Sequence, residues 1–272
     1  MLVSKDFRTV QAGTGSPTVV FESGLSASAS EWVAVQRLVA ERTSTLSYDR
    51  AGYGGSAPAA DGRLLTDLAA DLERVLTHTA VTGPVVLVGH SWGCPVIRQY
   101  LQTTEREVAG VVLVDGTVSA VMTEREAKRA KAVFGLMTRV SRTGLHKPLM
   151  MATMKGARGT ISDEDNALIL RDMLRPSDLR AAAAEARGLA TVAPAMADLE
   201  AQGFPVGVPV TFLMGALPDR GQTEMRATFV ETTRAEAERL GARFVVAGGS
   251  SHFVPQQEPQ LVVDEVLRLV GG

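Results

Sequence analysis

The fold of this chain is decided by the stretch Val85-Val86-Leu87-Val88-Gly89-His90-Ser91-Trp92-Gly93. Four apolar strand formers lead into a G-x-S-x-G motif, and a helical pattern runs from Pro95 to Leu101. In that context the serine lies on a sharp strand-to-helix turn, where side chains larger than glycine would collide with the backbone. We therefore predict that Ser91 is an exposed nucleophile and that the Trp92 N–H is free at the helix start. The alternative is a tight turn without chemistry.

Length and composition indicate a globular protein with one large core. The 272 residues are 45% hydrophobic, which suits a single α/β domain. A net charge of −2 without basic or acidic blocks argues against nucleic acid or an anionic membrane surface as a partner. One cysteine excludes an internal disulfide framework, and the first residues lack the layout of a signal peptide. No apolar run approaches the roughly 18 residues of a membrane span, so we predict a cytoplasmic protein without a membrane partner.

Strand patterns alternate with helical patterns along most of the chain. Apolar strand-like runs occur at residues 7–11, 18–21, 45–48, 85–88, 108–114, 208–214 and 243–247. This alternation predicts a parallel sheet with right-handed crossovers. A mainly helical segment, which holds seven of the ten methionines, interrupts it. We therefore predict a core of residues 1–116 and 206–272, with residues 117–205 inserted over the carboxyl ends of the strands.

A nucleophilic serine needs a base to take its proton and a third group to orient that base. Of the four histidines, His252 directly follows the last strand pattern, as the chain order serine, acid, histidine requires. We predict that His252 is the general base. His78 and His146 suit surface or insertion positions, and His90, inside the turn, suits a structural or pocket-wall role.

Three motifs together resemble the α/β-hydrolase superfamily. They are the Ser91 turn, the segment Asp49-Arg50-Ala51-Gly52-Tyr53-Gly54-Gly55-Ser56, and the segment Ser251-His252-Phe253-Val254-Pro255. The resemblance covers nearly the whole chain and implies an α/β fold with a mostly parallel, eight-stranded sheet. It further implies helices on both faces and a helical cap after the sixth strand, which corresponds to residues 117–205. We interpret Asp49-Arg50 as stabilising a turn and not as catalytic.

The oxyanion hole of such hydrolases combines two backbone N–H groups, one of which follows the nucleophile. Here that residue is Trp92. The second donor comes from the loop after the third strand, which reads His-Gly-x in many members of the family. This chain has Ser23-Gly24-Leu25 there, so the resemblance implies that Leu25 is the second donor. A backbone donor survives the loss of the family's histidine.

Two aspartates compete for the role of the acid. In one arrangement of the family the acid follows the seventh strand, and Asp219 stands near that position, one residue late and behind a proline. In the other arrangement it ends the sixth strand, where Asp115 follows an all-apolar run. A carboxylate there is costly to bury without a partner, which favours Asp115. Asp219 stays open as the alternative.

These residues predict a serine hydrolase without cofactor or metal. Its predicted substrate is a small to medium, largely apolar carboxylic ester, cleaved through an acyl-enzyme on Ser91 by a monomer or homodimer. Alternatives on the same triad are a thioesterase, a lactonase, a carbon–carbon bond hydrolase and a cofactor-free haloperoxidase. An alternative of another class is a non-catalytic, ligand-binding or receptor relative. The serine argues against epoxide hydrolase and haloalkane dehalogenase chemistry, for which related folds use aspartate.

Overall fold

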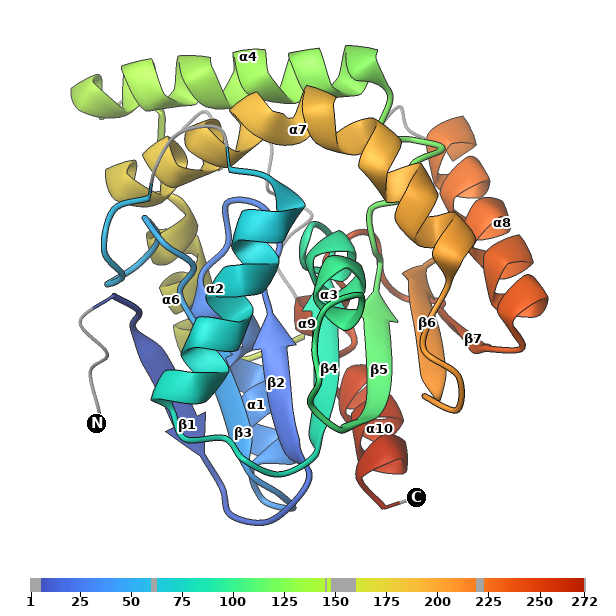
Figure 1. Cartoon of the computed structure of the whole chain (residues 1–272). Helices are drawn as coiled ribbons and strands as arrows, with labels where there is room; N and C mark the ends of the chain where they lie inside the picture. The colour runs from blue at the N-terminus through green and yellow to red at the C-terminus, as the bar shows by residue number, and fades with distance from the viewer. Residues whose placement is uncertain (1–5, 60–62, 145, 148–159, 219–222, 272) are drawn as a thin grey trace.

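The computed structural model describes residues 6–59, 63–144, 146–147, 160–218 and 223–271. These residues form a seven-stranded sheet in the order β1-β3-β2-β4-β5-β6-β7 (Figure 1). β1 pairs antiparallel with β3, and every other neighbouring pair is parallel. The strands are β1 (Thr9–Ala12), β2 (Thr18–Glu22), β3 (Thr45–Tyr48), β4 (Val85–His90), β5 (Val108–Val114), β6 (Val210–Gly215) and β7 (Arg243–Ala247). The mostly parallel α/β architecture expected from the sequence is confirmed.

The strand count differs from the eight strands that the resemblance implies. The described residues hold seven strands, and the helical segment follows the fifth of these. Hydrogen-bonded pairing runs without a gap from β1 to β7, so an eighth strand would have to extend one edge of the sheet. Residues 1–5, which precede β1, lie outside the described residues.

Helices cover both faces of the sheet because successive residues of each strand point to opposite sides. In β4, Val85 and Leu87 pack in a cluster with α2 and α3, whereas Val86 and Val88 pack with α1 and α10. All four side chains are fully buried, as a continuous apolar run in a parallel sheet predicts. The helices of the core are η1 (Ala29–Trp32), α1 (Val33–Val39), α2 (Leu65–His78), α3 (Gly93–Leu101), α8 (Thr223–Leu240), α9 (Val254–Gln257) and α10 (Pro259–Val270).

The turn between β4 and α3 is as tight as its glycines suggest. Ser91 has a φ of +51°, in the left-handed region that non-glycine residues rarely adopt. A Cβ added to Gly89 would lie 2.8 Å from Ile97 Cδ1, and one added to Gly93 would lie 2.4 Å from the Glu22 carbonyl oxygen. Both glycines are therefore needed for α3 to begin this close to β4 and β2.

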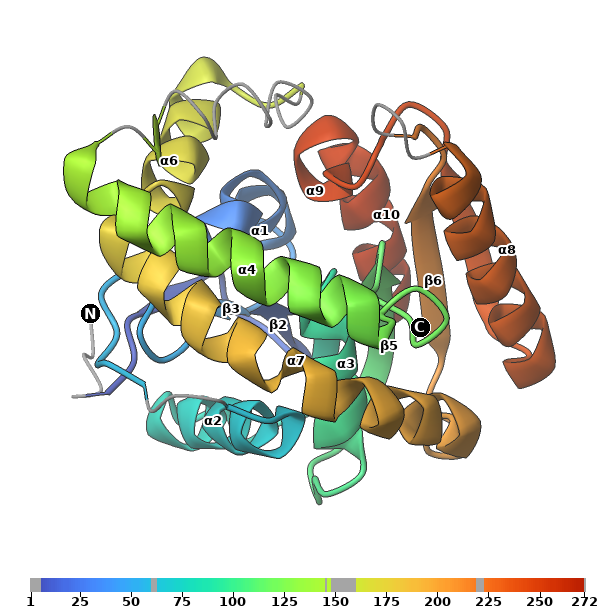
Figure 2. The same cartoon turned by 90° about the horizontal axis from the view of Figure 1, so that it is seen from above.

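Helical segments between β5 and β6 lie over the carboxyl ends of the central strands. They are α4 (Glu124–Val140), η2 (Ser141–Thr143), α6 (Asp163–Met173) and α7 (Pro176–Gln202). Figures 1 and 2 show α7 above the strand ends, with α4 lying across it on the outside. Leu189 of α7 and Ala127 of α4 share one apolar cluster with Trp92. In the described ranges, no helix combines the length and apolar character needed to cross a membrane.

Replacing Gly93 by alanine tests the close approach of α3 to β2. The new methyl group would collide with backbone, so we expect Gly93→Ala to lower the free energy of unfolding by about 1–3 kcal/mol, as overpacking does. Urea denaturation followed by circular dichroism measures this. Gly135→Ala in α4 is the matched control, because an added Cβ there meets no heavy atom within 4 Å. Gly135→Ala should raise the free energy of unfolding by up to about 1 kcal/mol. If the two variants changed stability equally, the close approach of α3 to β2 would be contradicted.

Candidate active site

The described side chains singled out in the sequence lie at the carboxyl edge of the sheet, on the side of helices α4, α6 and α7, for which we use the word cap only as a label. Ser91 follows β4, Asp115 follows β5, and His252 follows β7. The Ser91 N–H donates to the Val114 carbonyl oxygen over 3.0 Å, which ties the turn to the end of β5. Parallel pairing of β4 with β5 and of β5 with β6 therefore brings residues far apart in the sequence to one place.

His252 and Asp115 are in direct contact. The His252 Nδ1 lies 2.6 Å from Asp115 Oδ2, a distance typical of a charge-assisted hydrogen bond. The Asp115 side chain is 1% exposed, whereas that of His252 is 33% exposed. The imidazole is thus held at its Nδ1 from inside the protein while part of the ring stays open to solvent. Asp219, the alternative acid, lies outside the described residues.

Asp115 has further partners that keep it ionised. Its Oδ1 accepts hydrogen bonds from the Gly215 N–H at 2.9 Å and from Arg226 Nη1 at 2.6 Å. Burial by itself raises the pKa of Asp115, but the hydrogen bond and charge of His252 and the Arg226 guanidinium outweigh it and lower that pKa. Asp115 is therefore a buried carboxylate that accepts bonds on both oxygens.

Ser91 is only partly buried at the turn. Neither Ser91 Oγ nor His252 Nε2 has a hydrogen-bond partner among the described residues. Hydrogen bonds of this kind are often long or poorly aligned before substrate binds. Among the described residues, the hydroxyl and the outer ring nitrogen are thus both without a hydrogen-bond partner.

Two backbone N–H groups next to Ser91 are also unoccupied. Within the described part of the chain, neither the Leu25 N–H nor the Trp92 N–H donates a hydrogen bond. Their surroundings are close to the serine, because a Cβ added to Gly24 would lie 3.4 Å from Ser91 Cβ. This pair of free donors can stabilise an oxyanion that forms on a group attacked by Ser91.

Arg50 holds the loop that carries Leu25. The guanidinium is 1% exposed, and its Nη2 donates to the Gly24 carbonyl oxygen over 2.9 Å. It also forms ion pairs with Glu22 of β2 and, through two nitrogens, with Glu185 of α7. The expected turn-stabilising role of Arg50 therefore extends to a buried link between the core and the cap.

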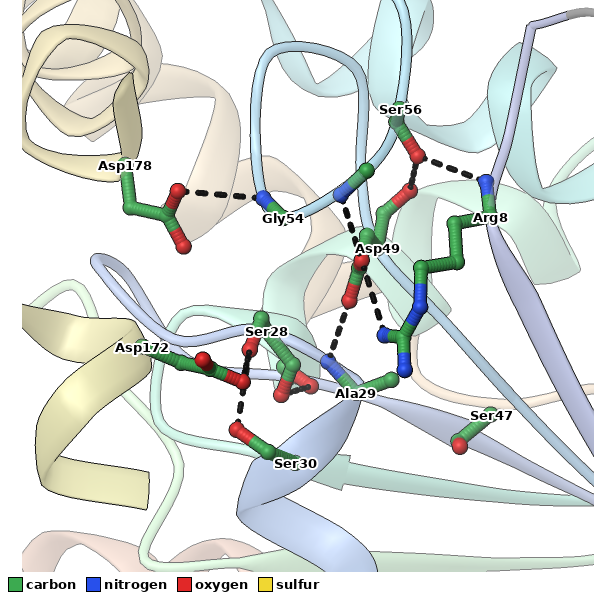
Figure 3. A network of polar contacts seen from close by, with 12 residues as sticks. Arg8, Ser28, Ala29, Ser30, Ser47, Asp49, Gly54, Ser56, Asp172 and Asp178 are labelled. Carbon is green, nitrogen blue, oxygen red and sulfur yellow. Dashed lines mark hydrogen bonds and ion pairs between the residues drawn. The ribbon is translucent and has the colours of Figure 1, made fainter. Parts of the chain in front are cut away.

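A second set of polar contacts joins helices α6 and α7 to the loops after β2 and β3 (Figure 3). The Ser28 hydroxyl reaches Asp172 of α6 at 3.5 Å, and the Gly54 N–H donates to Asp178 of α7 over 3.0 Å. Asp49 binds the Ala29 N–H at 2.9 Å and Arg8 at 3.0 Å, so it connects the start of η1 to the edge of the sheet. The cap is thus anchored through both loops that border the site.

The sequence analysis did not identify three charged partners of residues in and around the site. They are Arg226, which pairs with Asp115, Glu185, which pairs with Arg50, and Glu31, which pairs with His90. Arg226 lies 111 residues from Asp115, and Glu185 lies 135 residues from Arg50. A carboxylate after an apolar strand implies a cationic partner, but nothing in the sequence indicates which arginine supplies it. In the described ranges, no group of three or more His, Cys, Asp or Glu side chains could hold a metal ion.

Comparisons with known proteins agree with the fold. The model of the alpha/beta hydrolase family matches residues 19–265. A protein of Gibberella zeae described as an AB hydrolase superfamily protein is 26% identical over 93% of this chain and 86% of its own length.

Two solved structures share the fold. A thermophilic esterase from Thermogutta terrifontis superposes with a TM-score of 0.74 at 22% identity, over 98% of this chain and 94% of the esterase. The epoxide hydrolase CorEH has a TM-score of 0.74 at 20% identity, over 97% of this chain and 94% of CorEH. Because the two differ in activity, these likenesses show the fold alone.

Replacing Glu185 by leucine tests the buried link to the cap. It would leave the Arg50 guanidinium buried with one carboxylate fewer, so we expect a loss of about 3–5 kcal/mol in the free energy of unfolding. Urea titration measures it. The control is Glu124→Gln, which breaks an exposed ion pair with Lys128 in α4 and should leave stability unchanged. A Glu185→Leu protein as stable as the control would contradict the link.

Proposed function

The chain belongs to the alpha/beta hydrolase family, and we propose that it is a serine hydrolase that cleaves small to medium, largely apolar carboxylic esters. The observation that carries the proposal is the contact of 2.6 Å between His252 and the buried Asp115, next to a serine on a strained turn. A serine, a histidine and a carboxylate that follow strands at one edge of the sheet are the groups that acyl transfer requires.

In the proposed mechanism His252 acts as the general base. Its Nε2 takes the Ser91 proton as Oγ attacks the acyl carbon, and the same proton then goes to the leaving alcohol. Asp115 binds Nδ1–H, which holds the ring in the tautomer with a free Nε2 and stabilises the imidazolium. Water, activated by His252, then releases the acid from the acyl-enzyme and restores Ser91.

The Leu25 and Trp92 N–H groups form the proposed oxyanion hole. Negative charge develops on the acyl oxygen only as Ser91 attacks, so these two donors stabilise the transition state more than the bound ester. No side chain is needed for this, which is why a leucine can stand at the position of the donor.

The serine nucleophile favours an acyl substrate over an epoxide. Attack of Ser91 on an epoxide carbon would give an ether, which water does not cleave, whereas attack on an ester gives a new ester that His252 and water can hydrolyse. The likeness to an epoxide hydrolase structure therefore does not carry over to this chain's chemistry.

The surroundings of the serine support an apolar substrate. Leu25, Met122 and Phe134 are partly buried side chains that pack against the cluster around Trp92, between core and cap. Thioether and aromatic groups suit an adaptable apolar surface. Of the methionines noted in the sequence, Met150, Met151 and Met154 lie outside the described residues.

The other candidate activities share this machinery. A thioesterase, a lactonase, a carbon–carbon bond hydrolase or a haloperoxidase would differ in the shape of the substrate site, and a receptor would bind without turnover. No observation favours one of them over the ester hydrolase. The division into core and cap, the cytoplasmic location and the monomeric or homodimeric state stay predictions.

Turnover of short-chain nitrophenyl esters tests the proposal. We expect hydrolysis by the wild type, and a loss of about 10⁴-fold or more in kcat for Ser91→Ala and for His252→Ala, because each removes a member of the triad. A fluorophosphonate probe should label the wild type and leave Ser91→Ala unlabelled. His78→Ala, which alters an exposed histidine of α2, is the control and should keep full activity. A wild type with neither turnover nor labelling would show that the chain is not a serine hydrolase.

A comparison of two amide variants tests the acid. We expect Asp115→Asn to lower kcat by about 10⁴-fold, because asparagine stabilises the wrong histidine tautomer and no imidazolium. Asp219→Asn should stay close to the wild type in the same nitrophenyl ester assay. The reverse result would assign the role to Asp219.

A further inference from the structure

A buried ion pair lies directly behind the candidate site. Glu31 of η1 is 6% exposed and His90 of β4 is 2% exposed, and Glu31 Oε1 lies 2.8 Å from His90 Nδ1. Neither residue has a role in the proposed mechanism. Two ionisable side chains in the interior require a reason, because burial of a charge is costly unless each polar atom is satisfied.

The two remaining polar atoms of this pair each form a hydrogen bond to backbone at the site. The second oxygen of Glu31, Oε2, accepts the Gly24 N–H at 2.8 Å, and Gly24 directly precedes the oxyanion donor Leu25. The other ring nitrogen of His90, Nε2, lies 2.8 Å from the carbonyl oxygen of His252. One chain of hydrogen bonds thus runs from the backbone of the oxyanion loop to the backbone of the general base.

The protonation of His90 follows from its partners. A carbonyl oxygen only accepts, so Nε2 must carry a proton, and an ionised Glu31 requires a second proton on Nδ1. Burial alone lowers the pKa of His90, but the charge and hydrogen bond of Glu31 outweigh it and raise that pKa. Burial likewise raises the pKa of Glu31, but the charge and hydrogen bond of His90 together with the Gly24 N–H outweigh it and lower that pKa. Both ring nitrogens of His90 thus have an acceptor within hydrogen-bond distance, as an imidazolium requires.

We propose that Glu31 and His90 act as one pair of positioning residues, which holds the oxyanion loop and the His252 backbone at a fixed separation around Ser91. This inference rests on the proposed function. The His90 ring also lies against the His252 ring, with 4.8 Å between centroids, so it supports the base as well as its main chain. A displacement of about 1 Å at reacting groups costs on the order of 10²-fold in rate.

The test compares variants that break the pair with one that keeps its hydrogen bonds. Glu31→Leu and His90→Leu each remove one end, and we expect kcat on nitrophenyl esters to fall about 10²-fold with KM little changed. In Glu31→Gln the amide can accept from Gly24 and donate to the Nδ1 of a neutral His90, whose Nε2–H still binds His252. We therefore expect Glu31→Gln to keep most of the wild-type kcat, which a role of the charge alone would not allow.

A double variant separates positioning from failure to fold. Glu31→Leu/His90→Leu leaves no unpaired buried charge, so it should fold even where a single variant does not. Because the pair acts as one unit, its kcat should fall about as far as that of either single variant. The control is Glu236→Leu in α8, which breaks a buried pair with Arg98 about 15 Å along the helix from Arg226 and should keep the wild-type kcat.

A spectroscopic measurement determines the protonation of His90 independently of ester turnover. Nitrogen-15 correlation spectra of the ring nitrogens should show His90 protonated on both nitrogens at pH 7, with the assignment taken from the signal lost in His90→Leu. An unprotonated Nε2 would overturn the proposal, since His90 could then not donate to the His252 carbonyl oxygen, and so would a folded double variant with wild-type kcat. If the wild type lacks both ester turnover and probe labelling, the proposed function fails first and the positioning role falls with it.

Discussion

The buried carboxylate of Asp115 is the constraint around which the site is arranged. An ionised carboxylate at the end of an apolar strand is tolerable only when both oxygens are satisfied, and here His252, Arg226 and the Gly215 N–H do so. Each partner comes from a different element that follows β5 in the chain. The charge therefore requires β6, α8 and the loop after β7 to meet at one point, which is also the point where Ser91 emerges.

Two residues at the carboxyl edge of the sheet have a strained backbone. Ser91 and Asp115 both follow neighbouring parallel strands, and both have a positive φ, +51° and +43°. Such conformations cost on the order of 1–3 kcal/mol each and persist only where the surroundings impose them. Packing next to Asp115 is also tight, since a Cβ on Gly116 would lie 2.8 Å from the side-chain sulfur of Cys94.

Charge pairing also links the parts of the molecule that border the site. Arg50 connects β2 and the loop that carries Leu25 to Glu185 of α7, while Glu31 and His90 connect the same loop to His252. Both networks are buried, so each polar atom that loses its partner carries a large cost. The position of the Leu25 N–H consequently depends on the cap on one side and on the loop after β7 on the other.

The sequence by itself determined the features that depend on local pattern. The apolar runs predicted the parallel strands, the glycines around Ser91 predicted the tight turn, and three motifs predicted the family. The sequence did not predict which residues far apart in the chain are in contact. The sequence did not decide whether Asp115 or Asp219 is the acid. It also did not identify Arg226, Glu31 and Glu185 as ionic partners, because a polar residue in a helix looks the same whether it faces solvent or a distant charge. Only the tertiary structure brought Asp115 to 2.6 Å from His252, since register and crossover decide which strand ends meet.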